Sequence, residues 1–230
     1  GSGAGGAPLA ARLAQAGKSV LVLEAGPQFK AAHYTSDEIE SREIYWLNER
    51  LSGGRNPQPF GGNNSGTGVG GSLLHYGAFL PRPDARDFKL HTETGRSVDW
   101  PFRYEELLPY IEEVESFIGV SGPAQYPWDP SRHYAYAPPP ANPAAIKMRE
   151  ACDAVGLRHA DGPTALITRN VTQPHFGERE ACANCGACHQ GCRNGAKSGA
   201  DNTWLPLAVA HGAEIRPGCF VHTLSLIHIS

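Results

Sequence analysis

The sequence predicts an α/β fold with an irregular, helix-containing insertion. The chain begins with a glycine-rich turn, residues 1–6, which leads into a helical pattern and then into a short apolar strand at residues 20–23. Residues 101–175 combine helical patterns with a proline-rich stretch, which predicts irregular structure between helices. The order of turn, helix and strand is typical of a parallel sheet, and its first strand would precede residue 1.

Composition and charge exclude two classes of protein. The 230-residue chain carries 20 basic and 23 acidic side chains, a net charge of −3, whereas nucleic-acid-binding proteins usually carry a basic excess. No run of about 18 apolar residues occurs, so the sequence predicts no transmembrane segment. With 27 glycines, 19 prolines and 40 % hydrophobic residues, we expect a globular, loop-rich protein, in the cytoplasm or in a bacterial periplasm.

The first six residues match the G-x-G-x-x-G pattern of dinucleotide-binding proteins. Gly1 and Gly3 let the backbone bring its N–H groups against a pyrophosphate, and Gly6 lets the following helix pack close to a strand. Glu24 lies 18 residues after Gly6, close to the roughly 20 expected for a carboxylate that binds ribose hydroxyls. The sequence therefore predicts a partial Rossmann-like domain, and the alternative is a plain glycine-rich turn.

The remaining elements follow from periodicity and from glycine or proline positions. Leu9 and Leu13 fall on one face of the first helix, and Gly17 is placed to end it. Residues 123–143 are rich in proline and aromatic residues, which predicts an irregular segment. Further helices are predicted over residues 103–119, 144–155 and 203–212, and a returning strand over residues 213–215.

A second glycine-rich loop spans residues 53–71 and precedes His75. Such a loop can approach a ligand as closely as the first. A nicotinamide cofactor usually needs one glycine loop of this kind, whereas an extended FAD is held along more of its length. The second loop therefore favours FAD.

These motifs, in this order, resemble the glucose-methanol-choline (GMC) oxidoreductase family, and more narrowly the large subunits of bacterial gluconate dehydrogenases. The resemblance implies FAD bound by an N-terminal Rossmann-like domain. It also implies that the CH–OH group of a small alcohol or sugar is oxidised by hydride transfer to the flavin. The resemblance rests on residues 1–6, 24–26, 70–72, His75, Arg82, 99–101, 104–110 and 195–197.

His75 stands at the G-G-x-x-x-H spacing at which some family members attach the flavin covalently. Tyr76 replaces the asparagine or tryptophan that usually follows. The alternatives are a noncovalent histidine beside the isoalloxazine and a histidine satisfied in the core. The cofactor-binding residues that the resemblance implies are Gly1, Gly3, Gly6, Glu24, Ala25, Gly70, Gly71, His75, Tyr76, Gly77 and, through its backbone, Val221.

The resemblance also implies how the chain is organised. Residues 1–100 would be an FAD-binding segment without its first strand, residues 101–175 an insertion that forms part of the substrate domain, and residues 176–230 a cysteine loop that returns to the FAD-binding domain. Because the chain begins inside a glycine motif and ends in an apolar run, we expect an internal, inactive fragment of a longer enzyme. The family's catalytic histidine would lie beyond residue 230, so no catalytic residue is assigned.

Four of the six cysteines form the pattern C-x-x-C-x-x-C-x-x-x-C, the spacing of bacterial ferredoxin loops that hold iron–sulfur clusters. Arg193 stands where such loops usually carry proline. The alternatives are zinc, disulfides and plain thiols. A cluster would pass electrons from the flavin to a cytochrome and would favour a dehydrogenase over an oxidase. The candidate ligands are Cys182, Cys185, Cys188 and Cys192.

Two other functions are weighed against this interpretation. One is a nicotinamide-dependent dehydrogenase, which the second glycine loop disfavours. The other is a noncatalytic iron–sulfur electron-transfer module built around the cysteine run.

Overall fold

The computed structural model describes residues 1–46, 55–56, 65–175 and 177–224. Residues 53–54 and 57–64 of the predicted second glycine loop lie outside the described residues. Within the described part, helices and short strands are both present, which agrees with a partial α/β domain. No helix in that part has both the length and the apolar character needed to cross a membrane.

The chain divides into two units, residues 1–77 with 170–230 and residues 78–169. The first unit contains a parallel pair of strands, β1 (Leu21–Leu23) and β4 (Glu214–Arg216). The pairing confirms the predicted strand and the predicted returning strand. Glu24 directly follows β1, so it lies at one end of this small sheet.

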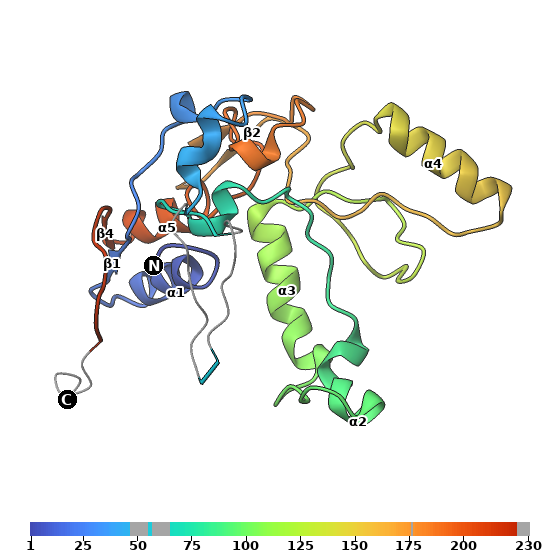
Figure 1. Ribbon diagram of the computed structural model, residues 1–230, viewed down its shortest axis with the longest axis horizontal. Coiled ribbons are helices and arrows are strands. Elements are labelled where there is room, and N and C mark those ends of the chain that lie inside the picture. The colour runs from blue at the N-terminus through green and yellow to red at the C-terminus, as the bar shows by residue number, and fades with distance from the viewer. Residues whose placement is uncertain (47–54, 57–64, 176, 225–230) are drawn as a thin grey trace. The chain divides into compact units, whose positions relative to one another are not determined.

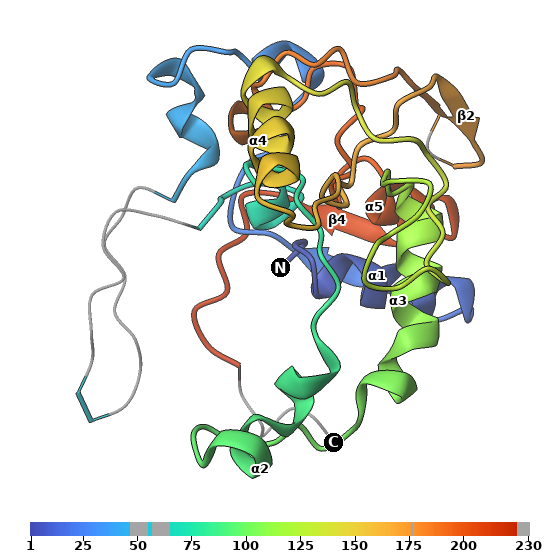
Figure 2. The ribbon, with the colours of Figure 1, turned by 90° about the vertical axis from the view of Figure 1, so that its right-hand side faces the viewer.

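Two helices of the first unit, α1 (Gly6–Gln15) and α5 (Trp204–Ala210), pack against each other. Both views show them side by side (Figures 1 and 2). Leu9 and Leu13 do share a face of α1, but they are 60 % and 40 % exposed. Alanines form the buried face instead, and their small side chains let the helices approach closely. The buried residues of α1 are Ala7, Ala10, Ala11 and Ala14.

The first unit also contains a hairpin of β2 (Val171–Gln173) and β3 (Gly177–Arg179), which the sequence analysis did not predict. Its strands are three residues long, too short to show a clear alternation of apolar and polar residues. Short 3₁₀ helices complete the unit. They are η1 (Ala31–His33), η2 (Glu40–Ile44), η3 (Gly71–Leu74) and η5 (Cys188–Gln190).

In the second unit, the predicted helices are confirmed as α3 (Tyr104–Ile118) and α4 (Pro143–Ala154). Gly119 ends α3 with a φ of 81°, a left-handed conformation that glycine adopts without strain. No residue of α4 is buried, and α4 stands apart from α3 in Figure 1. The unit also contains η4 (Ala85–Lys89) and α2 (Leu90–Thr94).

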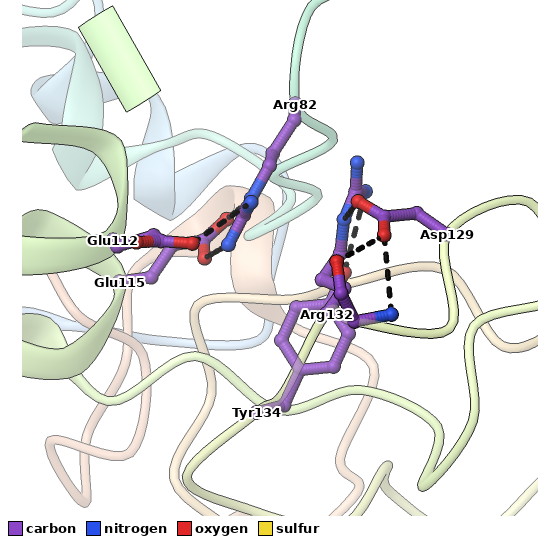
Figure 3. A network of polar contacts seen from close by, with 7 residues as sticks. Arg82, Glu112, Glu115, Asp129, Arg132 and Tyr134 are labelled. Carbon is purple, nitrogen blue, oxygen red and sulfur yellow. Dashed lines mark hydrogen bonds and ion pairs between the residues drawn. The ribbon is translucent and has the colours of Figure 1, made fainter. Parts of the chain in front are cut away.

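A buried ion pair ties α3 to the segment that precedes α2 (Figure 3). Arg82 donates from Nε and Nη2 to the two carboxylate oxygens of Glu115, at 2.9 and 2.6 Å. The two side chains are only 4 % and 8 % exposed. Glu112 lies 3.6 Å from the same guanidinium, and a second arginine, Arg132, lies 3.6 Å from Asp129. The geometry is bidentate, which makes the Arg82–Glu115 pair a strong one.

Candidate functional site

The glycine turn at the start of α1 is closed by a contact that only glycine permits. A Cβ atom on Gly6 would lie 2.0 Å from the carbonyl oxygen of Gly1, far inside van der Waals contact. The close neighbour of the Gly6 Cβ position is therefore the Gly1 carbonyl, and the packing of the helix against the motif's first strand stays a prediction. The turn is compact because Gly6 has no side chain.

The two glycine-rich segments meet backbone to backbone in the first unit. A Cβ atom on Gly71 would lie 2.8 Å from the Cα atom of Gly3. Farther along, a Cβ atom on Gly26 would lie 2.2 Å from the backbone nitrogen of Gly68. The two segments therefore lie side by side through their backbones, and their joint service of one site stays a prediction.

Glu24 lies at this junction and holds it together. The backbone and the hydroxyl of Ser2 donate to its Oε2 at 2.9 and 2.7 Å, and the backbone of Gly26 donates to Oε1 at 3.0 Å. Burial by itself raises the pKa of Glu24, but these hydrogen bonds outweigh it and leave the pKa below its ordinary value. The carboxylate is therefore ionised, and Oε1 has room for one more donor.

Ser2 links Glu24 to the second glycine segment. Ser2 occupies an x position of the G-x-G-x-x-G motif, so the motif does not predict this role. Its fully buried hydroxyl donates to Glu24 and accepts from the backbone N–H of Gly70 at 3.0 Å. Ser2→Ala leaves that N–H without its acceptor, so we expect the free energy of unfolding to fall by about 2 kcal/mol. Urea unfolding measures the loss. Ser72→Ala is the matched control, because the Ser72 hydroxyl bonds to Gly66 in an exposed place; equal losses in both variants would contradict this role.

The glycine turn before α1 has open space beside two of its glycines among the described residues. A Cβ atom on Gly1 or on Gly5 would meet no described atom within 4 Å. No side chain caps the helix, and its first turn carries no acidic residue. Backbone N–H groups at a helix N-terminus attract anions. The residues present therefore fit a diphosphate at this position.

His75 is buried on the C-terminal side of the second glycine segment. Its side chain contacts the ring of Tyr45, with 4.5 Å between ring centroids. Within the described part of the chain, its buried Nε2 atom has no hydrogen-bond partner. A buried polar atom is normally satisfied, so this one is consistent with a partner from outside the described residues, a bound group included. The neighbouring Tyr76 donates from its hydroxyl to the carbonyl of Ser198 at 2.6 Å.

The pH dependence of stability should report on His75. Burial, and then the positive charges of Lys197 and His189, lower the pKa of His75 from its ordinary value of 6.5. The unfolded chain then binds a proton at a pH where the folded chain does not. The stabilising contribution is therefore present above pH 6.5 and is lost as the pH falls through the lower folded value. Urea unfolding at a series of pH values should show this decline, and His75→Gln should make the decline shallower.

The cysteine segment places two thiols against backbone N–H groups. Asn184 donates to the sulfur of Cys182 at 3.4 Å, and Lys197 donates to the sulfur of Cys192 at 3.3 Å. Burial raises the pKa of Cys188. All six cysteines are free thiols. Among the described residues, no three His, Cys, Asp or Glu side chains converge as metal ligands, so the structure gives the iron–sulfur prediction no support.

The remaining predicted residues are Ala25, Gly77 and Val221. Ala25 is half-buried beside Glu24. Gly77 is exposed, although a Cβ atom there would lie 3.0 Å from Nε2 of His189. Val221 is 45 % exposed, and its contact with an adenine stays a prediction. The roles of Tyr45, His189 and Lys197 could not be predicted from the sequence, because no local pattern marks partners so distant in the chain.

A family model, GMC oxidoreductase, matches residues 62–228, which is more than half of the chain. The chain belongs to the GMC oxidoreductase family. Members of this family are flavoproteins, and their N-terminal domain binds FAD. The match confirms the resemblance drawn from the motifs. The narrower likeness to gluconate dehydrogenase subunits is not shown.

Curated relatives of this GMC oxidoreductase chain act on alcohols and sterols. A 2-methyl-1,2-propanediol dehydrogenase of Mycolicibacterium austroafricanum is 34 % identical over 94 % of this chain and 40 % of its own length. A cholesterol oxidase of Mycobacterium tuberculosis is 28 % identical over 94 % of this chain and 37 % of its own length. A long-chain-alcohol oxidase of Arabidopsis thaliana is 32 % identical over 95 % of this chain and 25 % of its own length. The chain thus spans less than half the length of these relatives.

Proposed function

We propose that the chain supplies the FAD-binding part of an oxidoreductase that oxidises the CH–OH group of an alcohol or sugar. The observation that carries the proposal is the junction of the two glycine segments around Glu24, in front of the uncapped N-terminus of α1. When bound, FAD supplies the acceptor for the hydride that leaves the CH–OH carbon. The residues of the chain bind the cofactor, orient it and shield it from water.

We assign each group of residues a role in holding the cofactor. The N–H groups at the start of α1 bind the diphosphate, and Oε1 of Glu24 accepts a hydrogen bond from a ribose hydroxyl. The bare backbones of the second glycine segment let the cofactor lie close to the chain. The proposed cofactor contacts are Gly1, Gly3, Gly6, Glu24, Ala25, Gly70, Gly71, His75, Tyr76, Gly77 and Val221.

The substrate class is proposed from the relatives. The three described above are named for a diol, a sterol and long-chain alcohols, which supports an alcohol more directly than a sugar. We propose that the base that removes the hydroxyl proton is contributed by a histidine outside this sequence. On that proposal the chain by itself does not oxidise alcohols, and measurable turnover by the purified chain contradicts it.

Two finer features are proposed as alternatives within this function. His75 is either covalently attached to the flavin or packed beside it. Its Nε2 atom, which has no hydrogen-bond partner in the described part of the chain, suits both. The cysteine run either holds an iron–sulfur cluster, which would pass electrons to a cytochrome, or remains plain thiols.

The test is a visible absorption spectrum of the complete protein before and after denaturation, together with iron analysis. A flavin spectrum supports the proposed function, and flavin that stays with the acid-precipitated protein supports attachment to His75. Iron with bleachable brown absorbance supports the cluster. Iron without any flavin would favour the electron-transfer module, and a colourless protein that binds a nicotinamide cofactor would favour the nicotinamide enzyme.

A further inference from the structure

The turn that carries His75 is held by two side chains that come much later in the sequence. Nζ of Lys197 donates to the carbonyls of Leu74 and Tyr76, at 2.9 and 3.1 Å. Nδ1 of His189 lies 2.8 Å from the carbonyl oxygen of His75 itself. A carbonyl oxygen only accepts, so Nδ1 carries the hydrogen and donates it. Three consecutive carbonyls, centred on His75, are therefore fixed from one side.

Lys197 is bound so completely that it cannot turn without breaking the contact. Lys197 is only 3 % exposed. The third N–H of its ammonium group donates to the carbonyl of Cys188 at 2.6 Å. An ammonium has three N–H groups, and all three are used. Hydrogen bonds from a charged donor are stronger than neutral ones. The ammonium thus joins the His75 turn to the cysteine segment and leaves a fixed positive charge next to the turn.

The hydrogen bonds from Lys197 and His189 to these three carbonyls restrict where the His75 ring can lie. The rotamers open to a side chain depend on its backbone angles, and here the carbonyls before, at and after His75 are all held. The ring contacts Tyr45 on one side, and the Tyr45 hydroxyl donates to the carbonyl of His189 at 2.9 Å. His189 therefore holds both the backbone of His75 and the ring that packs against it. Among the described residues, the buried Nε2 atom of His75 has no hydrogen-bond partner.

We propose that Lys197 and His189 are positioning residues that orient His75 toward the bound flavin. This inference rests on the proposed function and deepens it. Both residues act through the His75 turn. Lys197 also contributes its charge, because a fixed positive charge near a flavin favours the reduced form, which carries more negative charge. The cysteine segment then serves the flavin site through His189 and through the carbonyl of Cys188, whether or not its thiols bind iron.

The test compares variants of the natural protein loaded with FAD. Lys197→Met keeps a long side chain but removes the charge and all three donors, whereas Lys197→Arg keeps the charge. We expect Lys197→Met to shift the visible maximum of the flavin and to lower its reduction potential, and Lys197→Arg to recover most of the potential. Lys147→Met is the control, because the Lys147 side chain is 77 % exposed and bonds only to a neighbour on α4.

His189→Leu provides a second arm that does not depend on Lys197. It removes one hydrogen bond to the turn, so we expect a smaller shift of the flavin maximum and little loss of stability. If Lys197→Met does not fold, His189→Leu decides the question. The inference is overturned if a variant that folds and binds FAD has the same flavin maximum and reduction potential as the unsubstituted protein. This holds even if the thermal stability of the variant is lower. Absence of flavin from the unsubstituted protein overturns the proposed function instead, and the two failures are distinct.

Discussion

Gly6→Ala is expected to disrupt the glycine turn and to abolish flavin binding. The new methyl carbon would lie 2.0 Å from the Gly1 carbonyl oxygen, which belongs to the backbone and has no rotamer to change. The turn must therefore open, and overpacking of this kind destabilises by about 3 kcal/mol. Opening the turn also moves the N–H groups that face the proposed diphosphate. Urea unfolding and the flavin absorbance of the purified protein measure the two losses.

Gly5→Ala is the matched control in the same turn. Gly5 has a φ of −87°, which any residue adopts, and no described atom lies within 4 Å of its Cβ position. We expect this variant to unfold at nearly the same urea concentration as the unsubstituted protein. If the two alanine variants were equally stable, the contact between Gly6 and Gly1 would not be what closes the turn.

Arg82→Met is expected to have the largest effect in the second unit. It leaves the Glu115 carboxylate, whose side chain is 8 % exposed, without the two hydrogen bonds that satisfy it. Removing one partner of a buried ion pair destabilises by about 3–5 kcal/mol, because the other charge stays buried. We expect the loss in urea unfolding, and Arg82→Met combined with Glu115→Leu to recover much of it.

The control for Arg82 is another arginine of the same unit. Arg86 pairs with Asp84, but both side chains are more than half exposed, and exposed pairs contribute little. Arg86→Met should leave the unfolding midpoint close to that of the unsubstituted protein. A double variant at positions 82 and 115 that is no more stable than Arg82→Met alone would show that the penalty does not come from the stranded carboxylate.

The helices α1, α3, α4 and α5 and the two parallel strands could be predicted because their signals are local, whereas the short α2 was not predicted. Apolar spacing and a terminal glycine mark α3, β1 is a short apolar run, and β4 follows the glycine turn at the end of α5. The buried face of α1 could not be predicted in the same way. Leu9 and Leu13 are the more hydrophobic residues, but α5 requires a close approach that only alanines permit.

The candidate site likewise contains residues marked by a local pattern and residues that only the fold brings together. The glycines and Glu24 belong to a motif of known spacing, so the sequence predicts them as site residues, and their contact with a cofactor stays a prediction. Ser2 and Lys197 act on partners 22 and 123 residues away, and no local pattern encodes such a distance. Their roles follow from burial: Ser2 is 0 % and Lys197 is 3 % exposed, so each polar atom has to find a partner inside the fold.

The direct meeting of Gly3 with Gly71, and of Gly26 with Gly68, has a consequence for engineering chimaeras. At such a crossing there is no side chain that a second mutation could trim to make room for a bulkier neighbour. The segments can therefore be grafted between related enzymes only as a set. A chimaera that exchanges one of them, with its own backbone path, would inherit a misfit that no single compensating substitution repairs.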